Sequence, residues 1–258
     1  MKLPELTYRV WKVWRRNFDV FMKTYKVNFF PPLLEPIFYL LAFGIGLGTI
    51  VQAIPGFSSY IQFIAPALLA ISMMNNSFFE CTYGSFVRMY YQKTFDAIIA
   101  TPVSIEEVIA GELVWGATRS LISTCIVLAV VGAFGLIGSP FFVFIPIVAF
   151  ISGLMFSSIA MCFTAVASNI DFFNYPAFLF ITPMFLLSGT FFPITAFPWS
   201  VQVVAQVFLP LTHVVNLSRG LMVGNLQLSL LLSILWIVAV TLVFFVLSIR
   251  LMKKKLIK

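Results

Sequence analysis

Residues 220–258 read GLMVGNLQLSLLLSILWIVAVTLVFFVLSIRLMKKKLIK, and this stretch decides the class of fold. The run from Gly220 to Ile249 has no charged side chain and is longer than the roughly 20 apolar residues that a helix needs to cross a bilayer. Arg250 and four lysines follow it. Because basic residues collect on the cytosolic side of membrane proteins, this stretch predicts a transmembrane helix with its C-terminal end in the cytosol.

The same pattern extends over the whole chain of 258 residues. Hydrophobic residues make up 61% and charged residues 10%, whereas soluble domains have roughly 45–50% and about 25%. Three further uncharged runs, Pro36–Phe79, Ser120–Ile170 and Phe172–Ser218, are each long enough for a crossing. Seven Lys and Arg precede Val27, so the net charge of +7 is placed to orient the chain in a bilayer and not to bind nucleic acid. Both termini are expected in the cytosol.

The uncharged runs and the turns between them predict an all-α integral membrane fold with six transmembrane helices. The expected spans are Phe30–Val51, Tyr60–Tyr83, Ile105–Gly135, Phe142–Ala167, Phe172–Phe191 and Ser229–Met252. We expect one transmembrane domain over residues 1–258. It consists of an interfacial segment (1–27), a six-span core (28–252) and a basic cytosolic tail (253–258).

The N-terminal segment has the pattern of an amphipathic helix. Apolar and aromatic side chains recur at a spacing of three to four residues: Val10, Trp14, Phe18, Phe21 and Tyr25. Charged side chains occupy another face: Arg9, Lys12, Arg16, Asp19, Lys23 and Lys26. Such a helix is typical of a membrane interface with anionic headgroups. It serves either as a membrane anchor alone or also as a surface for a cytosolic partner.

Residues 192–224 do not fit a simple span. Pro193, Pro198 and Pro210 divide this segment into pieces of about a dozen residues, too short for a bilayer core of about 30 Å. A single crossing here would also put the basic C-terminus outside, against the positive-inside rule. We therefore expect re-entrant helices on the outer side, which also hold His213 and Arg219. A lone histidine is expected to make local hydrogen bonds, because it lacks partners for metal binding or nucleophilic catalysis.

The longest cytosolic loop lies between the second and third spans. Gln92–Ala100 fits a short helix that ends at Thr101-Pro102, because proline disfavours helical geometry in the residue before it. Ser104 and Glu107 match a capping box, so a new helix is predicted to start at Ile105.

Four charged side chains fall within membrane depth, where charge is costly and marks functional positions: Glu35, Glu80, Glu112 and Arg119. Glu112 and Arg119 are seven residues apart, about 10 Å along a helix, which is too far for a direct pair. Arg119 is instead expected to reach Glu80 or Glu35 on a neighbouring helix. An ion-paired structural cluster and a role in substrate contact or gating both remain open.

Motifs for covalent chemistry are missing from the sequence. No phosphate-binding G-x-x-x-x-G-K-[ST] loop, zinc H-E-x-x-H or nucleophile G-x-S-x-G occurs. Cys81, Cys125 and Cys162 stand singly in apolar runs without the spacing of a metal or disulfide framework. We expect a protein that is not an enzyme and has no cofactor or metal of its own.

Several short motifs in order resemble one family over essentially the full length. They are Trp14–Asn17, Glu35–Leu41 with Gly46-Leu47-Gly48, Ile99–Ser104, Ser188–Pro193, and Pro210–His213 with Arg219–Leu221 and Gly224. With these motifs the chain resembles the type-2 ABC (ATP-binding cassette) exporter permeases, in particular the nodulation-factor (lipo-chitooligosaccharide) export branch.

The resemblance implies a permease that works as a homodimer in a bacterial-type cytoplasmic membrane, with two copies of a separate ATPase that binds ATP and Mg²⁺. It implies a coupling helix at about Gln92–Thr101 that docks on the ATPase. The contact residues would be Phe95, Asp96, Ile98, Ile99, Thr101 and Pro102, with the phenylalanine and isoleucines as apolar knobs and Asp96 as the polar contact. The alternative for this loop is a helix that only lies on the bilayer.

The resemblance also implies that the N-terminal helix is a second ATPase contact and that Pro193–Met222 caps the translocation path. The favoured cargo is a lipo-oligosaccharide or similar glycolipid, with drug-like molecules or polysaccharides as alternatives. An ion-coupled secondary transporter would predict an internal repeat with broken helices at the membrane midplane, and no convincing repeat is found. A channel or scaffold without an ATPase partner is a further alternative.

Overall fold

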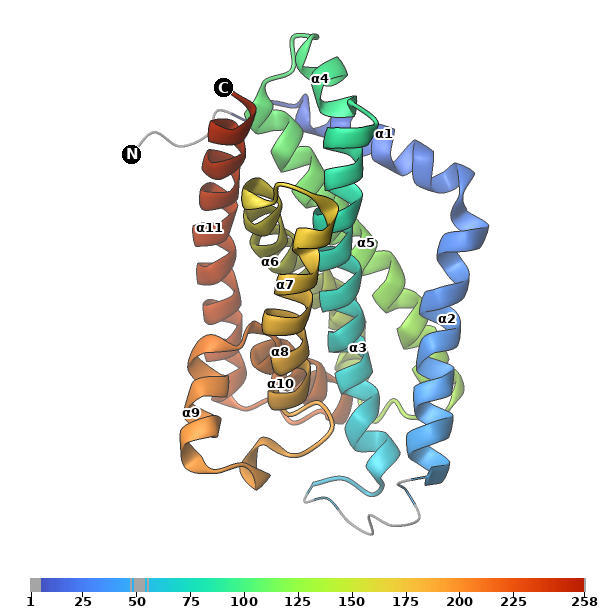
Figure 1. Cartoon of the computed structure of the whole chain (residues 1–258). Helices are drawn as coiled ribbons and strands as arrows, with labels where there is room; N and C mark the ends of the chain where they lie inside the picture. The colour runs from blue at the N-terminus through green and yellow to red at the C-terminus, as the bar shows by residue number, and fades with distance from the viewer. Residues whose placement is uncertain (1–5, 47, 49–53, 55, 258) are drawn as a thin grey trace.

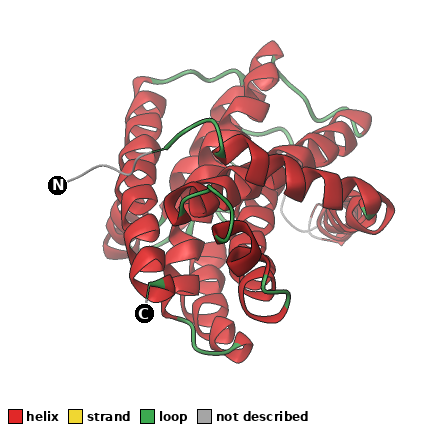
Figure 2. Cartoon of the chain, turned by 90° about the horizontal axis from the view of Figure 1, so that it is seen from above, coloured by secondary structure: helices red, strands yellow, loops and turns green. Residues whose placement is uncertain are grey.

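The computed structural model describes residues 6–46, 48, 54 and 56–257, and over these ranges helices and loops make up the chain, with no strand (Figure 1, Figure 2). Among the described residues, six helices are long and apolar enough to cross a membrane. They are Tyr25–Gly44, Tyr60–Tyr91, Ile105–Ala133, Pro140–Val166, Ile170–Leu187 and Leu228–Leu256. The predicted all-α fold with six spans is confirmed.

Most spans combine an α-helix with a shorter helical piece. The elements of the spans are α2 (Tyr25–Leu41) and η1 (Ala42–Gly46); α3 (Tyr60–Phe79), η3 (Glu80–Gly84) and η4 (Val87–Tyr91); α5 (Ile105–Ala133); η5 (Pro140–Phe144) and α6 (Ile145–Val166); η6 (Ile170–Phe173), α7 (Asn174–Pro176), η7 (Ala177–Ile181) and α8 (Thr182–Leu187); and α11 (Leu228–Leu256). The remaining elements are α1 (Val10–Lys23), α4 (Thr94–Ile99), η8 (Ile194–Ala196), α9 (Trp199–Phe208) and α10 (Pro210–Val223).

The two ends of the helix bundle are built differently (Figure 1). Helix α1 runs across one end, where α4 and the C-terminal end of α11 also lie. Helices α9 and α10 and the start of α11 lie at the opposite end. Both α1 and the last turn of α11 are thus on the same side of the bundle, as an even number of spans requires.

The centre of the bundle is formed by α3, α5 and α6, which all pack against one another. In the most apolar stretch of the second span, which contains α3, 72% is buried within the protein, against 11% for the first span and 17% for α11. Small residues allow this close packing, as is usual between membrane helices. A Cβ added to Gly116 of α5 would lie 2.3 Å from Ser157 Oγ of α6 and 2.7 Å from Cys81 Sγ. The first span and α11 therefore offer their remaining surface to lipid or to another chain.

Several span boundaries differ from the prediction: the fifth span ends at Leu187 and not at Phe191, the sixth ends at Leu256 and not at Met252, and the first two spans also differ. Helix α1 ends at Lys23, and the first span starts at Tyr25, with its three prolines inside α2 and not near the start of a later helix. The second span continues through two π-helical turns to Tyr91, past the predicted end at Tyr83. The predicted end of the first span, Val51, lies outside the described residues.

The segment between the fifth and sixth spans forms a bent helix pair. The axes of α9 and α10 meet at 90° at Leu209, and Pro198 and Pro210 stand directly before α9 and at the first position of α10. Proline fits these positions because it fixes a helical φ and has no N–H to leave unpaired. The bend agrees with the predicted re-entrant geometry, and Pro193 precedes the short turn η8 that leads into the pair.

His213 and Arg219 hold this bent pair to the rest of the bundle. His213 Nε2 lies 2.8 Å from Gln206 O, its Nδ1 lies 3.2 Å from Ser233 Oγ, and its ring stacks on Trp236. Arg219 donates to Gly189 O at 2.6 Å and its guanidinium lies 3.8 Å from the centre of the Phe63 ring. Both side chains thus make local structural contacts.

Candidate functional site

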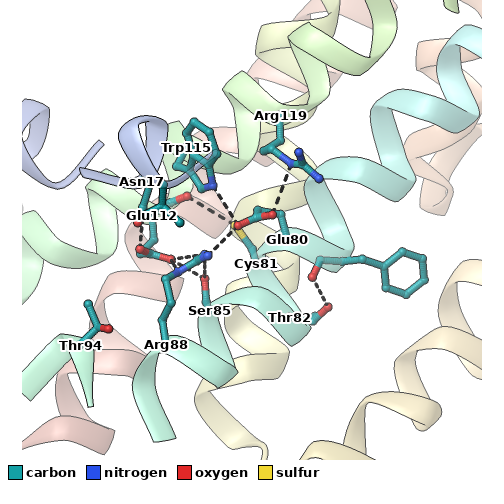
Figure 3. Close-up of polar contacts among 12 residues, drawn as sticks. Asn17, Glu80, Cys81, Thr82, Ser85, Arg88, Thr94, Glu112, Trp115 and Arg119 are labelled. Carbon is teal, nitrogen blue, oxygen red and sulfur yellow. Dashed lines mark hydrogen bonds and ion pairs between the residues drawn. The ribbon is translucent and has the colours of Figure 1, made fainter. Parts of the chain in front are cut away.

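A cluster of four charged side chains is buried between α3, its π-helical extension and α5 (Figure 3). This charge cluster comprises Glu80, Arg88, Glu112 and Arg119. At least 84% of each of these side chains is shielded from solvent. A buried charge without a partner is strongly destabilising. The stability of the bundle therefore depends on how these four side chains are paired.

Arg88 is the centre of the charge cluster. Its Nη1 lies 2.8 Å from Glu80 Oε1, and its Nη2 and Nε lie 2.6 and 2.9 Å from Glu112 Oε2. One guanidinium group therefore bridges two carboxylates, which is the planar donor geometry that arginine offers and lysine does not. Ser85 Oγ, one helical turn earlier, donates to the same Glu112 oxygen at 2.7 Å.

Glu80 has three partners and accepts hydrogen bonds from two of them. Besides Arg88, Trp115 Nε1 donates to Glu80 Oε1 at 2.9 Å, and Arg119 Nε lies 3.4 Å from Glu80 Oε2. The contact to Arg119 is an ion pair without hydrogen-bond geometry. The sequence predicts either Glu80 or Glu35 as the ion-pair partner of Arg119, and in the structure the partner is Glu80. Glu35 is exposed on α2, and no hydrogen bond or ion pair joins it to any other described residue.

Helix α1 covers the charge cluster from the end of the bundle. Its Asn17 is buried and donates to Glu112 Oε1 at 2.7 Å, and Trp14 Nε1 donates to Thr118 Oγ1 at 2.8 Å. A Cβ at Gly111 would lie 2.6 Å from Val13 Cβ, so α1 rests directly on the α5 backbone. The helix is therefore packed on protein through one face and leaves the side chains of Trp11 and Lys12 exposed.

A polar connection leads from the charge cluster to α4. Arg16 donates to Asn17 Oδ1 at 3.0 Å and to Thr94 Oγ1 at 3.3 Å. Half-burial of this guanidinium lowers the pKa of Arg16. Thr94 is the first residue of α4, so the chain of contacts runs from the charge cluster through Asn17 and Arg16 to the short helix beyond the spans.

The structure corrects the role expected for Phe95. Its side chain is fully buried, so it cannot be an apolar knob for another protein. Ile98 and Ile99 are half-buried and pack against the same core. Residues three and four apart share one helix face, and this apolar face points into the bundle. The opposite face of α4 and the turn after it carry the exposed residues Asp96, Ala97, Ala100, Thr101 and Pro102.

Sequence reasoning missed Arg88, Asn17 and Ser85. The predicted second span ends at Tyr83, which places Arg88 in the cytosolic loop that follows. The helical spacing of Glu80 and Arg88 could have indicated this pair, since residues eight apart lie on one helix face. In the part of the chain that the structure describes, no group of three His, Cys, Asp or Glu is placed to hold a metal ion.

Comparison with known proteins agrees with this architecture. The family model for the ABC-2 type transporter matches residues 8–223. Nodulation protein J of Rhizobium meliloti (strain 1021) is 35% identical over 245 residues, which is 95% of this chain and 92% of that protein. Nodulation protein J of Rhizobium leguminosarum bv. viciae is 34% identical over 249 residues, 95% of this chain and 94% of that protein.

A more distant relative is the inner membrane transport permease YadH of Escherichia coli (strain K12). It is 26% identical over 190 residues, 72% of each chain. No solved structure matches the chain. Six spans, a bent helix pair before the last span, and a family match over most of the sequence lead to one conclusion: this chain is a multi-pass membrane permease that belongs to the ABC-2 type transporter family.

Proposed function

We propose that this permease exports an amphipathic glycolipid or lipo-oligosaccharide from the cytosol, driven by a separate ATPase. Two copies of the permease would pair with two copies of the ATPase, which would bind ATP and Mg²⁺. The protein would lie in a bacterial cytoplasmic membrane with both termini in the cytosol. The ABC-2 family match and the nodulation protein J relatives support this assignment.

One observation supports the proposed coupling between the ATPase and the transmembrane spans. The exposed face of α4, with Asp96 and Ala97, lies beyond the spans, while Thr94 of the same helix contacts Arg16. Through Asn17, Arg16 is joined to Glu112 in the charge cluster. A partner that moved α4 would thus pull on α1 and on the ion pairs between the second and third spans. The other exposed positions, Thr101 and Pro102, would extend the docking surface.

Docking of the ATPase on α4 is tested with the same substitution, Asp to Lys, at two exposed positions. Asp96→Lys should abolish the stimulation of the ATPase by the permease, because it changes the exposed face of α4 without touching the core. Asp171→Lys reverses an exposed acid in η6, the other loop at this end of the bundle, and should retain most of the stimulation. Both variants are purified in detergent and mixed with the ATPase that co-purifies with the wild-type permease. Equal stimulation by wild type and Asp96→Lys would overturn the docking surface.

The cargo class is tested with inside-out vesicles that contain permease and ATPase. ATP-dependent uptake is measured for an acylated oligosaccharide, the same oligosaccharide without its acyl chain, and a hydrophobic dye. We expect uptake of the acylated compound alone. Uptake of the free saccharide or the dye in its place would favour the polysaccharide or drug-like alternatives. Uptake that persists without ATP and stops with an ionophore would favour an ion-coupled transporter.

A further inference from the structure

A cavity of about 380 Å³, lined by both charged and apolar side chains, lies beneath the elbow where α1 meets α2 at Thr24. Its walls come from α1, the start of α2, the π-helical end of the second span, and α5. Three arginines and one carboxylate line it: Arg16, Arg88, Arg119 and Glu80. The cavity therefore opens beside the charge cluster, at the end of the bundle that holds α1.

The charges around this cavity do not balance. Three guanidinium groups face two carboxylates when Glu112, directly behind the wall, is included, which leaves an excess of one positive charge. Both carboxylates are occupied by donors. Glu112 accepts from Asn17, Ser85 and Arg88, and Glu80 accepts from Arg88 and Trp115.

Of the three arginines, Arg119 has the most unused N–H donors. Its one ion pair is the 3.4 Å contact to Glu80, and it donates no hydrogen bond to any residue that the structure describes. Its guanidinium carbon lies 4.9 Å from the centre of the Phe21 ring, which stabilises a cation without using its N–H groups. An arginine has five N–H donors in a planar fork that matches phosphate and carboxylate oxygens. A cavity next to this side chain is thus suited to an anion.

The depth of the cavity indicates the kind of anion. Helix α1 lies across the spans and is amphipathic, with Trp11 and Lys12 exposed, which is typical of the headgroup layer. The cavity lies between α1 and the spans, and Val20 and Asn28 are among its lining residues. On α2, Phe29 and Phe30 beside Asn28 are exposed apolar surface. A ligand with its anionic group at Arg119 and its acyl chain along α2 would satisfy both environments.

We propose that this cavity binds the anionic headgroup, phosphate or sulfate, of an amphiphile in the leaflet that contacts α1, with Arg119 as the main cation and Arg16 as the second. Arg88 is already bound to two carboxylates and holds the wall in place. The amphiphile is either a phospholipid of the bilayer or the exported cargo. Only the cargo source rests on the proposed function, because lipid binding needs neither the ATPase nor transport.

The test measures lipid binding to the purified full-length permease by native mass spectrometry. Phosphatidylglycerol is the anionic probe and phosphatidylcholine the neutral reference. Arg119→Gln should weaken phosphatidylglycerol binding by about tenfold or more, the loss expected for charge-assisted hydrogen bonds. Lys26→Gln removes one positive charge from the exposed start of α2 and should change binding less than about twofold, because surface charges contribute weakly. Equal losses in the two variants would overturn the site.

A third variant separates binding from folding. Glu80→Gln removes the carboxylate that competes for Arg119, so phosphatidylglycerol should bind more tightly than to wild type. A purely structural role of the ion pair predicts no gain in phosphatidylglycerol binding, and that result would also overturn the proposal.

The same assay with an acylated oligosaccharide, with and without a sulfate group, identifies whether the bound amphiphile is bilayer lipid or cargo. Binding of phosphatidylglycerol alone assigns the cavity to bilayer lipid, whereas preferential binding of the sulfated compound assigns it to cargo. No Arg119-dependent binding of either probe would contradict the proposal.

Discussion

Arg88 Nη2 lies 2.6 Å from Glu112 Oε2, and this contact joins the second transmembrane span to the third within the buried charge cluster. Glu112 is 1% exposed and also accepts from Asn17 of α1. Three elements that are distant in sequence therefore meet at one carboxylate. Its removal is the most direct test of how the cluster contributes to stability.

Glu112→Ala should destabilise the protein by about 3–5 kcal/mol, because it leaves the Arg88 guanidinium with Glu80 as its single carboxylate partner and Asn17 without an acceptor. The thermal unfolding midpoint in detergent, followed by tryptophan fluorescence, measures the loss. The double variant Arg88→Leu with Glu112→Leu should be more stable than Glu112→Ala, because no unpaired charge remains between these two positions. A double variant that is less stable than the single one would contradict this reasoning.

Exchanging the charges of Glu80 and Arg119 should fail to restore stability. An arginine at position 80 would face Arg88 and the Trp115 N–H, which are both donors that now contact Glu80 within 3 Å. We expect the double variant Glu80→Arg with Arg119→Glu to unfold at a lower temperature than Arg119→Gln alone. A swap with the wild-type midpoint would show that the two residues form an isolated pair.

Phe95→Ala should destabilise the protein by about 3–5 kcal/mol, the usual cost of truncating a fully buried phenylalanine. Asp96→Ala, at the next position but exposed, should change stability by less than about 0.5 kcal/mol. The thermal midpoints of the two variants decide between a core position and a docking position at residue 95. Similar midpoints would mean that Phe95 is not a core residue.

Gly116→Ala should destabilise the bundle by about 1–3 kcal/mol, because the new methyl group would overlap Ser157 and Cys81 across the contact of α5 with the second and fourth spans. Gly132→Ala is the control in the same helix. Its Cβ would lie 3.2 Å from the flexible end of Ile137, and alanine favours helix by about 1 kcal/mol over glycine. If unfolding midpoints fall equally for both variants, the close packing at Gly116 is not special.

Arg219→Leu should destabilise the protein by about 1.5–3 kcal/mol, since it removes a charged donor from the Gly189 carbonyl. Limited proteolysis should then cut the segment around η8 faster than in wild type. Arg15→Leu changes an exposed arginine of α1 and should leave the cutting rate at η8 unchanged. Equal protection of η8 in all three proteins would separate Arg219 from the stability of the bent pair.

Much of the fold could be predicted because the bilayer constrains sequence strongly. Uncharged runs located six spans, and the Ser104–Glu107 capping box placed the start of α5 at Ile105, where the structure has it with both reciprocal hydrogen bonds. The spacing of Pro193, Pro198 and Pro210 indicated a broken segment, and α9 and α10 bend by 90° there. These features depend on local composition, on chain geometry and on the cost of burying charge.

The partners of the buried charges were less accessible from sequence. The uncharged runs mark Glu80 and Arg119 as charges at membrane depth, but they place Arg88 in a loop because hydropathy falls before the helix ends. The burial of Phe95 is not predictable from the pattern of a six-residue helix, because so short a helix does not reveal which face is covered. In both cases the answer depends on what α1 and α5 place beside the helix.

The sequence by itself determined a six-span membrane protein, because the transfer of each apolar or charged side chain into lipid is a local cost that adds along the chain. Only the tertiary structure decided that Arg88 bridges Glu80 and Glu112, that Asn17 of α1 completes the cluster, and that Phe95 points inward. Those outcomes depend on the distances between helices that are far apart in sequence. Ion pairs and hydrogen bonds in a low-dielectric interior act only within about 3–4 Å, and no periodicity within one helix encodes that spacing.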